Sequence, residues 1–141
     1  MEAVVIYESL TGNTARAGQS IAAGLRAAGV PSRAFPITKI DYQALSRADL
    51  VVVGSWVDGL ILVGQRPGRM GRITSMPALA GKKAVVYLTY AIDPGKSLEK
   101  LAKAVEGRGA EVLGGCTIRR DKLTPGVEDL VDRILGITAP A

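Results

Sequence analysis

A short polar turn near the N-terminus carries the side chains best suited to bind an anion. The loop that follows an apolar run at residues 3–7 reads Glu8-Ser9-Leu10-Thr11-Gly12-Asn13-Thr14; residues 9–14 are the polar turn, which opens a helix-like segment. Helix N-termini offer unpaired backbone N–H groups and a partial positive charge, and glycine lets a ligand approach the backbone closely. With hydroxyls and an amide but no Lys, the turn suits a phosphate monoester held by hydrogen bonds. The alternative is a polar turn in which Thr14 or Asn13 only caps the helix.

The motif content excludes several common chemistries. The chain has no G-x-x-x-x-G-K-[ST] motif, which excludes a magnesium-nucleotide phosphate loop. It has no G-x-G-x-x-G after its first strand, which argues against a dinucleotide site. The absence of His and the single Cys exclude His-based triads, disulfide frameworks and multi-cysteine metal sites. We therefore expect no metal, and we expect Cys116 to be a buried apolar residue.

Apolar runs alternate with helix-like segments from one end of the chain to the other. The predicted strands are residues 3–7, 32–37, 50–53, 84–89 and 111–118. Helices are predicted over 13–28 and, more briefly, over 41–46 and 67–75. Asp93 is predicted to cap a fourth helix that ends before Gly107, and Thr124 to cap the last one. This alternation predicts an α/β fold: one domain over residues 1–141, with three layers around a doubly wound five-stranded parallel sheet.

Composition and charge indicate a globular protein with a mildly basic surface. Of the 141 residues, 48% are hydrophobic and 22% charged, and the net charge is +5. The basic residues are scattered, which favours a solvated surface over a nucleic-acid face. No apolar run approaches the ~20 residues of a membrane span. Met1 is followed at once by a strand-like segment, which leaves no room for a signal peptide, so we expect a cytoplasmic location.

The position of the polar turn in the predicted sheet directs attention to two further segments. In open α/β sheets, ligands bind beyond the carboxyl ends of the strands, where successive connections diverge to opposite faces. The relevant loops are those after the first, third and fourth strands. The second is Gly54-Ser55-Trp56-Val57-Asp58-Gly59, and the third is Thr89-Tyr90-Ala91-Ile92-Asp93-Pro94-Gly95.

Residues 4–14, V-V-I-Y-E-S-L-T-G-N-T, resemble the N-terminal signature of the flavodoxin family. That signature is an apolar strand ending in an aromatic, a variable residue, and then [S/T]-x-T-G-x-T opening a helix. The positions in register are Tyr7, Ser9, Thr11, Gly12, Thr14 and Ile21. Gly18 stands where the family usually has Ala, a difference of about 1 kcal/mol in helix propensity. The resemblance extends over the whole chain and implies sheet order 2-1-3-4-5, with the phosphate of FMN in the polar turn.

The same resemblance implies that a flavin ring lies between the second and third loops. Trp56 and Tyr90 are then candidates to stack on the ring. Related sequences place the aromatic about two residues later, where this chain has Asp58, so Trp56 is alternatively a partly buried wall residue. Gly59 is either the peptide that responds to flavin reduction or an ordinary turn glycine. The implied FMN contacts are Ser9, Leu10, Thr11, Gly12, Asn13, Thr14, Ser55, Trp56, Val57, Asp58, Gly59, Thr89, Tyr90 and Ala91.

The resemblance implies an FMN-binding electron carrier as the function. Flavodoxins are usually acidic, whereas this chain is basic, so we expect its redox partner protein to have an acidic docking face. We expect the chain itself to be a monomer or weak homodimer. Arg66, Arg69 and Arg72 fall on one face if helical, and we expect them to make the reduction potential less negative than that of acidic relatives. The alternatives are an FMN-dependent oxidoreductase, of the quinone reductase or protoporphyrinogen-oxidising type, and a non-redox binding module that has lost FMN.

Overall fold

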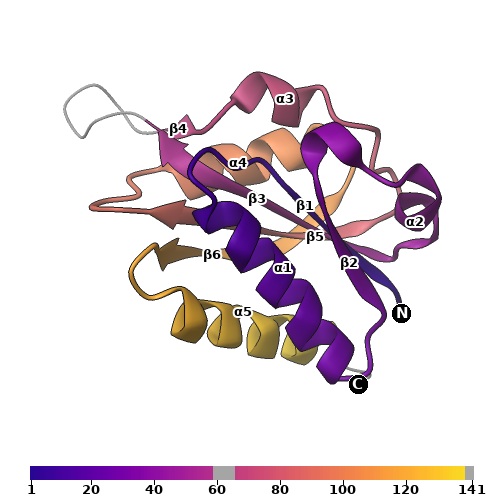
Figure 1. Cartoon of the computed structure of the whole chain (residues 1–141). Helices are drawn as coiled ribbons and strands as arrows, with labels where there is room; N and C mark the ends of the chain where they lie inside the picture. Colours follow the sequence, from indigo (N-terminus) through magenta and orange to yellow (C-terminus); the bar gives the residue numbers. More distant parts are fainter. Residues whose placement is uncertain (59–65, 139–141) are drawn as a thin grey trace.

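The computed structural model describes residues 1–58 and 66–138, and these residues build one central parallel sheet (Figure 1). Its strands run in the order β2-β1-β3-β5-β6, which confirms the predicted arrangement. A short β4 pairs antiparallel with the end of β3 and accounts for the shift in strand numbers. The strands are β1 (Ala3–Tyr7), β2 (Ser32–Pro36), β3 (Leu50–Asp58), β4 (Arg66–Pro67), β5 (Lys83–Tyr90) and β6 (Glu111–Arg119).

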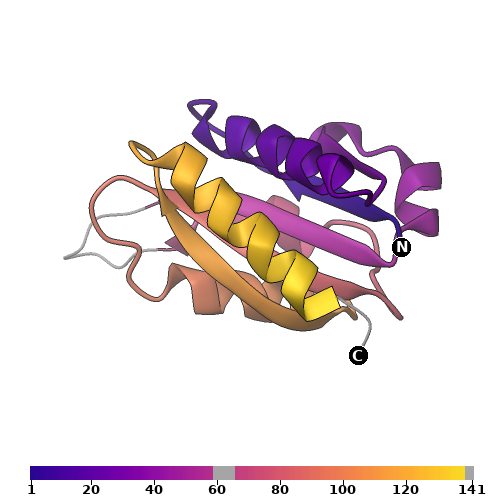
Figure 2. The ribbon, with the colours of Figure 1, turned by 90° about the horizontal axis from the view of Figure 1, so that it is seen from below.

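Helices cover both faces of the sheet. The pair α1 (Asn13–Ala27) and α5 (Leu123–Thr138) packs against one face, and Figure 2 shows the two helices side by side. The other face carries α2 (Tyr42–Arg47), α3 (Met70–Thr74) and α4 (Ser97–Glu106). A 3-10 turn, Ile37–Lys39, precedes α2. The predicted three-layer architecture is therefore confirmed.

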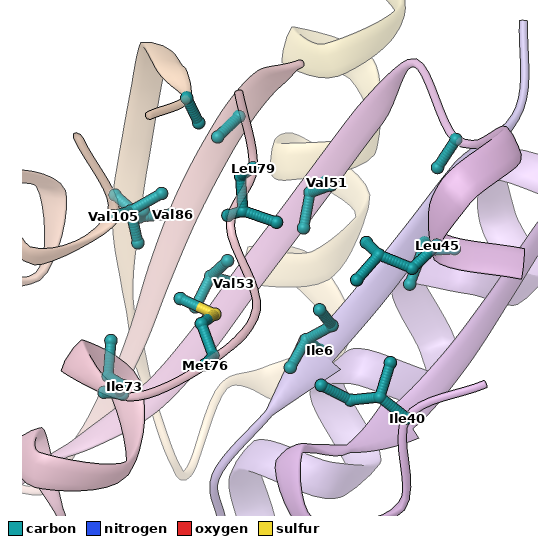
Figure 3. Close-up of a cluster of buried hydrophobic side chains, with 14 of the residues drawn as sticks. Ile6, Ile40, Leu45, Val51, Val53, Ile73, Met76, Leu79, Val86 and Val105 are labelled. Carbon is teal, nitrogen blue, oxygen red and sulfur yellow. The ribbon is translucent and has the colours of Figure 1, made fainter. Parts of the chain in front are cut away.

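The β-branched runs supply both cores because successive side chains of a strand point to opposite faces. In β3, Val51 and Val53 join the cluster beneath α2, α3 and α4 (Figure 3). The intervening Val52 joins the cluster beneath α1 and α5. A strand buried on both faces in this way reads as a continuous apolar run, which is why the central strands were predictable.

Tyr87 in β5 connects the sheet to α1. The side chain is fully buried, and its hydroxyl donates a hydrogen bond to the carbonyl of Thr14 at 2.9 Å. The ring lies so close to Gly54 of β3 that a Cβ there would overlap it. At Gly18 of α1, a Cβ would lie 2.7 Å from the Tyr87 hydroxyl oxygen. The departure from the family pattern at Gly18 thus has a physical reason, the space that the Tyr87 hydroxyl occupies.

Four predicted boundaries are wrong. The third strand continues past Gly54 to Asp58, so most of the second predicted loop is strand. The helix predicted over 67–75 begins only at Met70, because Arg66 and Pro67 form β4 and Arg69 adopts a left-handed conformation with φ 47°. Asp93 does not cap α4.

The carboxylate of Asp93 instead accepts a hydrogen bond from the N–H of Gly95 at 3.0 Å, within a turn that precedes the helix. α4 therefore begins at Ser97. The last helix begins at Leu123, one residue before the predicted cap Thr124. By contrast, Asp41 does cap α2, since its carboxylate accepts hydrogen bonds from the N–H groups of Gln43 and Ala44.

Candidate functional site

The first turn of α1 is tied to the carboxyl end of β5. The Thr14 hydroxyl lies 2.8 Å from the hydroxyl of Thr89, and both residues are buried. In the sheet, Thr89 is the register partner of Trp56 in β3. These contacts bring the polar turn and the ends of β3 and β5 to one edge of the sheet, as the sequence predicted.

The polar turn is shaped by Ser9 and Gly12. Gly12 has φ 95° and is the N-cap residue of α1, with no side-chain capping bond. The Ser9 hydroxyl accepts hydrogen bonds from the N–H groups of Gly12 and Ala15, at 3.2 and 3.3 Å. The interpretation in which Asn13 or Thr14 caps the helix is therefore wrong. The Asn13 amide instead bonds to Thr11 and to Arg16.

The turn presents unused backbone donors. Among the described residues, no hydrogen bond engages the N–H groups of Leu10, Thr11, Asn13 or Thr14. No atom lies within 4 Å of the position that a Cβ at Gly12 would take, so the backbone there is approachable. Several N–H groups around the positive end of a 15-residue helix, with neighbouring hydroxyls, match the needs of a phosphate. The residues present therefore fit the phosphate of FMN.

The end of β3 is held by the segment that follows β4. Ser55 is fully buried, and its hydroxyl donates to the carbonyl of Gly68 at 2.9 Å. The N–H of Gly68 donates in turn to the carbonyl of Trp56 at 2.7 Å. The half-buried Trp56 indole packs so tightly on Gly68 that a Cβ there would overlap it. The guanidinium of Arg69 lies 5.5 Å from the indole centroid. Part of the Trp56 surface is therefore covered by the protein itself.

The remaining predicted residues lie around the same edge. Val57 is half-buried and packs on the core beneath α3 and α4, and Asp58 ends β3 as the register partner of Arg66. Tyr90 is half-buried at the end of β5, followed by the exposed Ala91. Gly59 lies outside the described residues. Contact of these residues with a flavin stays a prediction.

Glu8 is a feature of this edge that the sequence analysis missed. It follows β1 directly, and its N–H donates to the carbonyl of Gly54 at 2.9 Å. The side chain is only 3% exposed, yet it is a carboxylate. It accepts hydrogen bonds from Arg69 at 2.6 Å and from Arg72 at 3.1 and 3.4 Å. An acidic residue next to the turn and two arginines three positions apart were the available signal, but nothing in the sequence paired them.

Two large apolar side chains are exposed near the site. Leu10 in the polar turn is 61% exposed, and Ile92 in the turn after β5 is 83% exposed.

Burial raises the pKa of the Cys116 thiol to about 11. In the part of the chain that the structure describes, no cluster of three or more His, Cys, Asp or Glu could hold a metal ion. Nor is any described helix both long and apolar enough to cross a membrane.

Comparison with known proteins identifies the family and the fold. The model of the flavodoxin domain family matches residues 4–130. The two-electron reduced flavodoxin of Megasphaera elsdenii superimposes with a TM-score of 0.73 at 20% identity, covering 92% of this chain and 96% of that one. Flavodoxin 1 from Bacillus cereus gives 0.72 at 21% identity and coverage of 100% and 99%. A cysteine-to-serine mutant of flavodoxin from Pseudomonas aeruginosa gives 0.73 at 15% identity and coverage of 99% and 100%. Comparison with curated protein sequences gave no match.

Proposed function

The chain belongs to the flavodoxin family, and we propose that it holds FMN at the carboxyl edge of its sheet, with the phosphate on residues 9–14. It is an FMN-binding electron-transfer protein. FMN supplies the redox chemistry when bound, and the protein binds and orients it. The observation that carries the placement is the set of N–H donors around Gly12 that no described residue engages, beside the hydroxyls of Ser9 and Thr11.

Titration of the apo-protein with FMN, riboflavin and FAD tests the proposal. The fluorescence of FMN should be quenched on binding. FMN should bind with at least tenfold higher affinity than riboflavin, because riboflavin lacks the phosphate that the turn engages. Substitution of Gly12 by Ala should weaken FMN binding more than riboflavin binding, since φ 95° strains any residue with a Cβ. Gly71→Ala is the matched control, because that helical glycine has open space around it and lies in α3. Equal affinities for FMN and riboflavin would exclude the phosphate site.

We propose that the flavin ring lies against the ends of β3 and β5. The ends of β3 and β5 border the polar turn and supply Val57, Asp58, Thr89 and Tyr90, with Ala91 directly after β5. Trp56 would contact the ring only with the part of its indole that Gly68 and Arg69 leave uncovered. Ser55 would act indirectly, since its hydroxyl already donates to Gly68. Gly59 stays in the proposal on its place in the sequence alone.

The charge distribution supports an acidic docking face on the redox partner. The described segments at the carboxyl edge, residues 8–16, 56–58, 66–72, 90–97 and 119–124, contain eight basic and four acidic residues. Their net charge is +4, whereas the rest of the chain carries +1. Exposed Leu10 and Ile92 add apolar contact area at that edge. A basic surface around an apolar contact favours association with an acidic partner.

Small redox reagents test the sign of the field at the cofactor. The reduced protein should be oxidised faster by anionic ferricyanide than its driving force alone predicts, and the rate should fall as salt is added. Oxidation by cationic hexaammineruthenium should become faster with salt. The opposite salt dependences would refute the basic docking surface.

We further propose that the protein works in the cytoplasm as a monomer or weak homodimer formed by the single domain of residues 1–141.

A further inference from the structure

The buried carboxylate of Glu8 lies next to the proposed phosphate site, where its negative charge is unfavourable. Glu8 immediately precedes the polar turn, and its N–H is fixed to β3 through the carbonyl of Gly54. A phosphate monoester carries a charge of about −1.5 to −2 at neutral pH. An uncompensated carboxylate beside the turn would repel that charge. It would also be costly in itself, since a buried charge without a partner is strongly destabilising.

Two arginines from a distant segment compensate this charge. Arg69 and Arg72 are 61 and 64 residues away in the sequence, and both donate to the Glu8 carboxylate through Nη1. Their side chains are 40% and 49% exposed, so each guanidinium is partly in solvent while its tip reaches the buried acid. The group of Glu8, Arg69 and Arg72 therefore has a net charge of +1. We call it the Glu8 cluster.

The backbone at Arg69 has an uncommon conformation at the point from which this contact is made. Arg69 is the one described residue other than glycine with positive φ, a conformation that is uncommon for side chains with a Cβ. It precedes α3, and its guanidinium also lies over Trp56. One arginine thus touches both the acid beside the polar turn and the aromatic wall at the end of β3.

From these contacts we infer that the Glu8 cluster determines the preference for a phosphorylated flavin, with Arg69 and Arg72 converting a repulsive carboxylate into a net positive charge beside the phosphate. This inference rests on the proposed phosphate site. It assigns a specificity role to three residues that the turn's own hydrogen bonds do not involve.

Four proteins form a charge series that tests the inference. Glu8→Gln raises the cluster to +2, the native cluster is +1, Glu8→Gln/Arg69→Gln/Arg72→Gln is 0, and Arg69→Gln/Arg72→Gln is −1. At a separation of about 10 Å, low salt and a water-like dielectric, each unit of charge changes the affinity for a phosphate dianion about threefold. The ratio of riboflavin to FMN dissociation constants should therefore fall in that order, over about thirtyfold in total.

The direction of the Glu8→Gln effect separates charge from structure. Glu8→Gln and Arg69→Gln/Arg72→Gln both break the same ion pairs, so a merely structural brace would weaken FMN binding in both. We expect instead that Glu8→Gln raises the preference for FMN while the double variant lowers it. Arg120→Gln is the control, because it removes an exposed positive charge at the same edge without touching Glu8. Its ratio should stay within about twofold of the native value.

Fluorescence-quenching titrations with FMN and riboflavin at 20 mM and 500 mM salt give the required ratios, with circular dichroism as the check of folding. The differences along the series should shrink at high salt. An unchanged ratio, or a parallel change in both affinities, would overturn the inference even if FMN binds well. If the double variant does not fold, Glu8→Gln and the triple variant still decide the sign. Failure of the native protein to bind FMN would instead overturn the proposed function.

Discussion

Replacing Gly18 by Ala tests whether the Tyr87 hydroxyl controls the packing of α1 on the sheet. In an isolated helix this change stabilises by about 1 kcal/mol. In this protein the new Cβ would lie 2.7 Å from the Tyr87 hydroxyl oxygen, 3.0 Å from Tyr7 Cδ2 and 3.3 Å from Val5 Cγ1. Tyr87 cannot move away easily, because Gly54 adjoins its ring on the β3 side. Overpacking of this kind costs about 1–3 kcal/mol, so we expect a net loss of about 1 kcal/mol.

Combining Gly18→Ala with Tyr87→Phe removes the tightest of these contacts. Tyr87→Phe alone should cost about 1 kcal/mol, since it deletes a buried hydrogen bond to the Thr14 carbonyl. In the Tyr87→Phe background, Gly18→Ala keeps its gain in helix propensity and loses the 2.7 Å contact with the hydroxyl oxygen. It should then be neutral or slightly stabilising. The coupling energy between the two substitutions is therefore expected to be about 1–2 kcal/mol.

Urea unfolding of the four apo-proteins, followed by circular dichroism, measures this coupling. A change of 1 kcal/mol corresponds to about 3–4 °C in Tm for a chain of this length. Tyr42→Phe is the control for removal of a hydroxyl, because Tyr42 is 66% exposed, and it should have almost no effect. If Gly18→Ala stabilises the native background, or if the two effects add within about 0.5 kcal/mol, Tyr87 does not explain the glycine.

Three further outcomes follow from the described contacts and charges. In urea titrations, Gly54→Ala should lower the free energy of unfolding by about 3 kcal/mol, because the new Cβ would overlap the Tyr87 ring. Gly71→Ala is the control, because its Cβ would enter open space, and it should leave the free energy of unfolding unchanged or slightly higher. Since burial raises the pKa of Cys116 from 9.0 to about 11, the unfolded chain loses this proton first. The stabilisation contributed by the protonated thiol is complete below about pH 9 and is lost between about pH 9 and 11. The free energy of unfolding should therefore fall across that window in the native protein, and fall less steeply in Cys116→Ala. Gln at Arg66, Arg69 and Arg72 should lower the one-electron reduction potential by about 50 mV at low salt, since each charge contributes about 0.4 kcal/mol at about 10 Å. Potentiometry measures this shift, and an unchanged potential would contradict the effect of these arginines on the flavin.

The parallel sheet was predictable because its strands are short β-branched runs buried on both faces. Residues 50–53 illustrate this, since alternate valines enter opposite cores. The turn after β1 was also predictable, because its hydroxyls and glycine precede a clear helical stripe. The order of the strands had a different source. It came from the flavodoxin resemblance of residues 4–14, and periodicity alone did not determine it.

The errors occur where a distant residue decides the local structure. A glycine usually ends a strand signal, so the third strand was predicted to stop before Gly54. In the structure Gly54 is an interior strand residue whose lack of a side chain makes room for Tyr87, 33 positions later. Nothing in the neighbouring sequence reports that contact. Likewise, residues 67–75 have helical spacing, but Pro67 pairs with Val57 and the helix is confined to Met70–Thr74.

Two sets of interactions of different kinds act on the polar turn, and salt can separate their effects on cofactor binding. From β5, the hydroxyls of Tyr87 and Thr89 hold Thr14 through neutral hydrogen bonds. From the segment after β4, Arg69 and Arg72 act through the charge on Glu8. Loss of a neutral bond changes where the turn's donors point, and 500 mM salt does not restore them. Loss of the arginines changes the electrostatic potential at the turn, which 500 mM salt screens within a few ångströms. Tyr87→Phe should therefore weaken FMN binding equally at low and high salt, whereas the deficit of Arg69→Gln/Arg72→Gln should largely disappear at high salt.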